Sequence, residues 1–170
     1  MKIKKINHNN FELFYSLLEK DFCFEERKTK QDQFNSLSKK QFNPHFIYKD
    51  NNFIGYFCWW DFDDFVFGEH FAILPEIRNR GLGSEFLKDF LSKQTKPFVF
   101  EVERPHNKSS QRRLSFYKRN GIIINGYDYY QPSYHNANDN VPMFIASYPS
   151  PLSYEEYLFY SKIIKDVVYN

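Results

Sequence analysis

The hydrophobic positions of this chain change several times between helical and strand spacing. Apolar residues three and four positions apart between Phe11 and Phe22 predict a helix, which Asn9 or Asn10 can cap. Helical stretches are also predicted at Glu25–Phe42 and Ser84–Leu91. Short apolar runs bounded by turn residues predict strands at Lys2–Ile6, Phe46–Lys49, Asn52–Asp61, Phe65–Leu74, Lys96–Glu103, Ile122–Tyr130 and Val141–Tyr148.

The segment Glu69–Gly83 carries the clearest functional signal. Apolar residues suit a buried strand, a proline ends it, and Gly81 and Gly83 form a turn that opens the next helix. Backbone N–H groups and the helix dipole attract an anion at such a position. Arg78 and Arg80 add positive charge. The segment therefore predicts a phosphate-binding turn, although it lacks the Gly-Lys-Ser/Thr ending of a P-loop.

A second motif lies downstream, between Arg112 and Ile122. Leu114, Phe116 and Tyr117 recur on one face of a helix, and Gly121 suits the end of that helix before an apolar strand. With the strand Lys96–Glu103 between the two motifs, the order is strand, glycine turn, helix, strand, helix, strand.

Both motifs resemble those of the GNAT superfamily of N-acetyltransferases. Arg78-x-x-Gly81-x-Gly83 is similar to the loop that binds the pyrophosphate of acetyl-CoA in that family, and Phe116-Tyr117 is similar to the end of a later helix. The resemblance implies an α/β (α+β) fold with a mixed, mostly antiparallel, twisted sheet flanked by helices. Two of its strands, here Phe65–Leu74 and Lys96–Glu103, are expected to run parallel and splay apart to admit the cofactor.

The resemblance also implies acetyl-CoA as the acyl donor and a set of contacts to it. The residues expected to bind it are Phe71, Ala72, Ile73, Arg78, Asn79, Arg80, Gly81, Leu82, Gly83, Ser84, Asn107, Ser110, Arg113 and Phe116. This chain departs from the family at two positions, because many relatives carry Asn seven residues and Ala four residues before the tyrosine. Ser110 and Arg113 stand there, so Asn107 or Ser110 would have to replace the contact that this Asn makes to the pantetheine arm.

Transfer of an acyl group to an amine needs a group that accepts the amine's proton. The resemblance implies Glu69 as a base acting through water, provided that partial burial raises its pKa from about 4.3. His70 is the alternative base, since its free pKa of about 6.5 suits the role. Strict strand alternation would place it on the opposite face from Glu69, but a bulge common in this family would change that. Tyr117 is implied as the group that hydrogen-bonds the departing thiolate.

The amine acceptor is less well defined. Acidic and phenolic residues near two predicted turns would suit a small cationic amine, and a protein or peptide amine is the other option. These weaker substrate candidates are Asp61, Asp64, Asp128 and Tyr130.

Residues 1–148 are expected to form the acetyltransferase domain, and residues 149–170 a helical extension. Two prolines, Pro149 and Pro151, break the chain, and Ser153-x-x-Glu156 predicts a capping box for a final amphipathic helix. Its apolar face must be buried, either on the same domain or on a partner subunit in a homodimer.

Composition limits the range of functions. The net charge of +2 comes from mixed charges without a basic stripe, so we expect no nucleic-acid partner. Two cysteines far apart and scattered histidines predict reduced thiols in a cytoplasmic protein and no metal site. No apolar run approaches the roughly 18 residues of a membrane span, so no membrane partner is expected.

Two functions from different classes remain. The first is an N-acetyltransferase that moves the acetyl group from acetyl-CoA to a primary amine by direct attack in a ternary complex, since neither cysteine lies in a recognisable nucleophile setting. The alternative is a non-catalytic acyl-CoA-binding regulatory module, which the missing helix Asn would fit. Retention of Tyr117 and Glu69 favours the enzyme.

Overall fold

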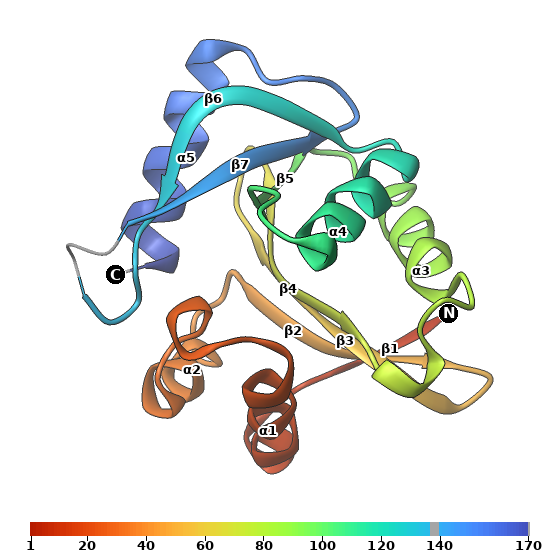
Figure 1. Ribbon diagram of the computed structural model, residues 1–170. Helices are drawn as coiled ribbons and strands as arrows, with labels where there is room; N and C mark the ends of the chain where they lie inside the picture. Colours follow the sequence, from red (N-terminus) through yellow and green to blue (C-terminus); the bar gives the residue numbers. More distant parts are fainter. Residues whose placement is uncertain (137–139, 170) are drawn as a thin grey trace.

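The computed structural model describes residues 1–136 and 140–169. Within these residues seven strands form one sheet in the order β1-β2-β3-β4-β5-β7-β6 (Figure 1). The strands are β1 Lys2–Lys5, β2 Phe42–Lys49, β3 Asn52–Asp61, β4 Val66–Ile73, β5 Phe98–Glu103, β6 Ile123–Gln131 and β7 Val141–Tyr148. The α-helices are α1 Phe11–Asp21, α2 Lys30–Ser36, α3 Leu82–Leu91, α4 Lys108–Arg119 and α5 Tyr154–Val168. Residues 137–139, which belong to the polar loop predicted between the last two strands, lie outside the described residues.

The parallel strands β4 and β5 are paired over only part of their length. Their pairing joins Val66, Phe67 and Gly68 to the segment Phe98–Phe100 and ends there, whereas the other described pairings are antiparallel. The predicted mixed sheet with two parallel, splayed strands is therefore confirmed.

A bulge on β4 lies where the two strands separate. β3 pairs Cys58 with His70 but Trp59 with Gly68, so Glu69 is an extra residue on β4. Because a bulge interrupts the alternation of side chains, Glu69 and His70 both line the same cavity.

Helices cover both faces of the sheet and bury two apolar clusters. Residues of α1 and α5, such as Phe14, Leu18 and Ile164, belong to one cluster, and residues of α3, such as Phe86 and Phe90, belong to the other. In Figure 1, α1 and α2 accordingly lie across the sheet from α3 and α4.

The predicted helix Glu25–Phe42 is wrong in extent. The structure has a short 3-10 turn at Phe24–Glu26, a two-turn α2, and β2 already begins at Phe42. Thr29 sets the start of α2, because its hydroxyl accepts a hydrogen bond from the N–H of Asp32 at 3.1 Å. Phe42 pairs with Trp60 on β3, and this long-range pairing outweighs the local helical pattern.

The final helix begins as the sequence predicts. The Ser153 hydroxyl accepts from the N–H of Glu156 at 3.1 Å, and the Glu156 carboxylate accepts from the N–H of Ser153 at 2.7 Å. Tyr160 and Ile164 are buried in the core, with the ring of Tyr160 stacked 4.3 Å from that of Phe65. In the described chain α5 thus packs on its own sheet.

Candidate active site

The turn between β4 and α3 forms the first part of the site. Gly81 has a φ of 78°, a left-handed value that favours glycine, and α3 begins directly after it. The N–H of Glu85 donates to the carbonyl of Gly81 at 3.0 Å. The N–H groups before Glu85 in the first turn therefore lie at the positive end of the helix without an intrahelical partner.

A cleft of about 530 Å³ opens beside this turn. Its walls come from β4, the glycine turn and α4. A Cβ built on Gly83 would lie 3.5 Å from the side chains of Ile73 and Phe116, which both line the cleft. A methyl group at this position would thus only touch the cleft walls, whereas a larger side chain would fill part of the cleft.

Most of the residues predicted to bind acetyl-CoA come together here. The cleft is lined by Phe71, Ile73, Arg78, Asn79, Gly81, Leu82, Gly83, Ser84, Arg113 and Phe116. Ala72 lines the adjoining cavity, whereas Arg80 is exposed and lines neither. The Arg78 guanidinium donates to Asp21 at 2.9 Å and to the carbonyl of Ile73 at 2.7 Å, so it is already held in place.

Asn107 and Ser110 line neither the cleft nor the adjoining cavity. Asn107 caps α4, since its side chain accepts from the N–H of Ser110 at 2.9 Å, and the buried Ser110 hydroxyl accepts from the N–H of Asn107 at 3.0 Å. The expected contact of these two residues with the pantetheine arm is therefore not supported, because the capping box uses both side chains. Ser109, which the sequence reasoning did not single out, lines the adjoining cavity instead.

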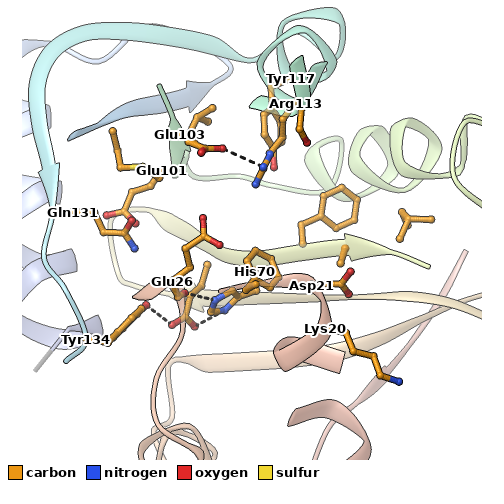
Figure 2. Close-up of a pocket in the computed structure, with 18 of the residues that line it drawn as sticks. Lys20, Asp21, Glu26, His70, Glu101, Glu103, Arg113, Tyr117, Gln131 and Tyr134 are labelled. Carbon is orange, nitrogen blue, oxygen red and sulfur yellow. Dashed lines mark hydrogen bonds and ion pairs between the residues drawn. The ribbon is translucent and has the colours of Figure 1, made fainter. Parts of the chain in front are cut away.

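The adjoining cavity has a volume of about 470 Å³. The cavity and the cleft share five lining residues, namely Phe71, Ile73, Arg78, Arg113 and Tyr117. The two spaces therefore meet at the splay between β4 and β5. Figure 2 shows side chains from several elements around this cavity, with Tyr117 and Arg113 on α4 and His70 on β4.

Glu69 lies at this cavity but is locked in an ion pair. Its carboxylate accepts from Lys28 at 2.6 Å, from the indole N–H of Trp60 at 3.0 Å and from the Tyr134 hydroxyl at 3.0 Å. Burial alone would raise the pKa of Glu69, but the charge of Lys28, the neighbouring His70 and the hydrogen bonds from Lys28 and Trp60 lower it to about 2. The geometry therefore disfavours the expected base role of Glu69, because a carboxylate with this pKa and a 2% exposed side chain is a poor proton acceptor.

His70 is also buried. Its Nε2 lies 3.0 Å from the carbonyl of Glu26, and its Nδ1 lies 3.9 Å from a Glu69 oxygen without a hydrogen bond. Burial lowers the pKa of His70 even though the charge of Glu69 raises it.

Glu101 on β5 is a site residue that the sequence reasoning missed. Its two carboxylate oxygens accept hydrogen bonds from the hydroxyls of Tyr129 and Tyr169, and the partly exposed residue lines the cavity. Burial raises the pKa of Glu101 to about 7 against the effect of these hydrogen bonds. A carboxylate within the apolar run Phe98–Val102 was the signal that could have revealed it.

Tyr117 lines both the cleft and the adjoining cavity. The group that contacts the sulfur of acetyl-CoA is expected at this position. Burial raises the pKa of its hydroxyl to about 12, and nearby Arg113 lowers it slightly against that trend. Within residues 1–136 and 140–169, the Tyr117 hydroxyl makes no hydrogen bond.

The four residues predicted to contact the acceptor do not come to the cavity. Asp61 pairs with Lys96 at 2.6 Å, and Asp64 is exposed in the turn before β4, at the end of the strand away from the splay. Asp128 and Tyr130 are exposed on β6. Two other tyrosines of the same hairpin do reach the site, because Tyr129 points the other way and donates to Glu101, and Tyr134 lines the cavity.

Among the described residues, no group of three or more His, Cys, Asp or Glu side chains is arranged to hold a metal ion. Nor is any helix in the described ranges long and apolar enough to cross a membrane.

Comparison with known proteins agrees with the fold and the glycine turn. The family model of the acetyltransferase (GNAT) domain matches residues 41–121, a range that contains both motifs. A solved structure described as a GNAT-family acetyltransferase from Bacteroides thetaiotaomicron is 29% identical, with a TM-score of 0.91 over 99% of this chain and 98% of that chain. No curated protein matches the sequence significantly.

More distant solved structures share the fold. The ribosomal-protein-S18-alanine N-acetyltransferase from Escherichia coli is 17% identical, with a TM-score of 0.61 over 91% of this chain and 96% of that chain. A GNAT acetyltransferase from Elizabethkingia anophelis with acetyl-CoA bound is 18% identical, with a TM-score of 0.57 over 86% of this chain and 95% of that chain. Residues 41–121 therefore match a GNAT acetyltransferase domain, and the fold of the chain is that of this acetyl-CoA-dependent family.

Proposed function

We propose that this protein transfers the acetyl group of acetyl-CoA to a primary amine by direct attack while both substrates are bound. The observation that carries this proposal is the meeting of two spaces at Tyr117, one beside a helix N-terminus and one lined by carboxylates. The first suits the pyrophosphate and pantetheine of acetyl-CoA. Acetyl-CoA bound in the Elizabethkingia relative supports this choice of donor.

The charges in the cavity favour an acceptor that arrives as a cation. Three of its carboxylates are neutralised by ion pairs, namely Lys28–Glu69, Arg78–Asp21 and Arg113–Glu103. Glu26 and Glu101 also line the cavity, and in the described residues neither pairs with a cationic side chain. A primary ammonium can therefore be attracted by two carboxylates that have no cationic partner among the described residues.

The proton that the amine loses goes to Glu101. Since an alkylammonium has a pKa of about 10.4, passing its proton to a carboxylate of pKa about 7 costs roughly 5 kcal/mol. The same transfer to Glu69, of pKa about 2, costs roughly 11 kcal/mol. This difference favours Glu101 as the base, and His70 is the second choice.

Acetyl-CoA supplies a thioester whose carbonyl carbon gains a C–N bond as its C–S bond breaks. Tyr117 donates a hydrogen bond to the departing thiolate. A thiol has a pKa of about 8.5, well below that of Tyr117, so complete transfer of the phenolic proton is uphill and a hydrogen bond is the better description.

A panel of primary amines, assayed for release of free thiol from acetyl-CoA and for the N-acetylated product, tests the proposal. We expect Glu101→Gln to lower kcat/KM about 10²-fold at neutral pH. The loss should shrink toward the pKa of the amine, where more acceptor arrives neutral. Glu155→Gln, at an exposed residue of α5, is the matched control and should behave as wild type.

Two outcomes would contradict this function. Binding of acetyl-CoA without turnover of any amine would favour a non-catalytic acyl-CoA-binding module. Unchanged activity of Glu101→Gln with an active wild type would assign the base to another group, with His70 the first to test.

A further inference from the structure

The C-terminal end of the chain reaches into the cavity. Tyr169 follows α5 directly, lines the 470 Å³ cavity, and donates its hydroxyl hydrogen to a Glu101 oxygen at 2.5 Å. The two residues are 68 positions apart in the sequence. The extension that follows the catalytic motifs thus contributes a side chain to the site.

Glu101 is held at both oxygens. Tyr129 on β6 donates to Oε1, and Tyr169 donates to Oε2. Two donors on one carboxylate fix its orientation and stabilise its charged form.

Two stacked tyrosines donate hydrogen bonds to the carboxylates of the two splayed strands. The ring of Tyr169 stacks on that of Tyr134 at a centroid distance of 4.6 Å. The Tyr134 hydroxyl donates to Glu69 on β4, whereas the Tyr169 hydroxyl donates to Glu101 on β5. Each ring of the stacked pair therefore donates to a different carboxylate, and Glu69 additionally pairs with Lys28.

The packing of α5 fixes where Tyr169 lies. Ile164 and Val168 are fully buried in the core, and Lys39 donates to the carbonyl of Val167 at 3.0 Å. The last turn of the helix is thereby anchored next to the residue that contacts Glu101.

We propose that Tyr169 is a positioning residue for Glu101, so that the C-terminal helix is a working part of the active site. The proposal rests on the proposed function, because it assigns Tyr169 its role through the base Glu101. The hydrogen bond directs the carboxylate at the cavity and keeps it ionised at a pH where it can accept the proton of the amine.

Several groups set the charge state of Glu101. Burial and the negative charge of Glu69 raise its pKa, while the hydroxyls of Tyr129 and Tyr169 and the ammonium of Lys165 lower it. Removing the Tyr169 hydroxyl deletes one of the lowering contributions, so the pKa of Glu101 should rise.

Direct titration of Glu101 tests this without requiring activity. Carboxyl carbons labelled with ¹³C are followed by NMR against pH, and the Glu101 signal is identified by its loss in Glu101→Gln. We expect Tyr169→Phe to move the midpoint of this signal upward by about one pH unit. Tyr157→Phe is the matched control on the same helix, since its hydroxyl donates to the carbonyl of Asp128 rather than to Glu101, and it should leave the midpoint unchanged.

The pH dependence of kcat/KM supplies the second readout. If Glu101 is the base, the acidic limb should move upward in Tyr169→Phe by the same amount as the NMR midpoint. An unmoved midpoint in a folded Tyr169→Phe protein would overturn the role of Tyr169. A midpoint that moves while the acidic limb stays would leave Tyr169 as the partner of Glu101 but refute Glu101 as the base.

Discussion

Replacing Lys28 by methionine should expose the cost of a buried, unpaired carboxylate. Lys28 lies 2.6 Å from Glu69, and their side chains are only 7% and 2% exposed. Trp60 and Tyr134 donate hydrogen bonds to Glu69 but carry no positive charge. Removing one member of such a pair leaves the other without compensation, so Lys28→Met should lower the free energy of unfolding by about 3–5 kcal/mol at neutral pH.

Lys30→Met is the matched control. Lys30 also pairs with a carboxylate, Glu12, at 2.8 Å, but these side chains are 54% and 78% exposed. Water and salt screen an exposed pair, so this variant should lose less than about 1 kcal/mol. The same residue type is removed in both variants, so the difference in cost reports burial.

The pH dependence has a definite sign. In the wild type the pKa of Glu69 is about 2, below an unfolded value of about 4.3, so its ionisation stabilises the fold above about pH 4 and this contribution fades as the pH falls toward 2. Without Lys28, burial becomes the main influence and raises the pKa of Glu69 above the unfolded value. The penalty should then be largest at neutral pH and diminish as acid protonates Glu69.

Urea denaturation followed by tryptophan fluorescence, at about pH 5 and about pH 8, measures both effects. Adding Glu69→Gln to Lys28→Met should recover part of the loss at the higher pH, since no charge is then buried. A cost equal to that of Lys30→Met, or a cost that does not change with pH, would refute the reasoning.

Two further predictions concern acetyl-CoA. Tyr117→Phe should lower kcat about 10²-fold with little change in acetyl-CoA affinity, because the hydroxyl acts only as the thiolate leaves; wild-type kcat would contradict this role. Gly83→Asp should abolish calorimetric binding of acetyl-CoA, because it places a side chain and a negative charge in the cleft. Gly126→Asp, at an exposed glycine with open space around it, should bind normally, and equal affinity in both variants would count against the cleft.

Local sequence patterns predicted the elements that carry the cofactor cleft. The phosphate-binding turn depends on residues close together in the chain, such as Gly81 and Gly83, and α3 begins there as expected. The splay of β4 and β5 followed from the family resemblance, and the pairing that ends at Gly68 agrees with it.

The acceptor side could not be predicted in the same way, because its contacts join distant residues. Lys28 is 41 positions from Glu69, and no local pattern indicates that this lysine would neutralise the expected base. Glu101 likewise depends on Tyr129 and Tyr169, which come from other elements. A shift of one residue in the pairing of β6 would turn its other face toward the site. The sequence alone does not determine this register.

The order of substrate binding and release tests the central claim most directly. Initial rates are measured at several fixed concentrations of amine while acetyl-CoA is varied, using any amine that the screen identifies. If the two spaces hold both substrates together at Tyr117, double-reciprocal plots will intersect and no acetylated protein will form without amine. Parallel lines, with an acetyl group retained by the protein, would show a covalent intermediate and contradict direct attack.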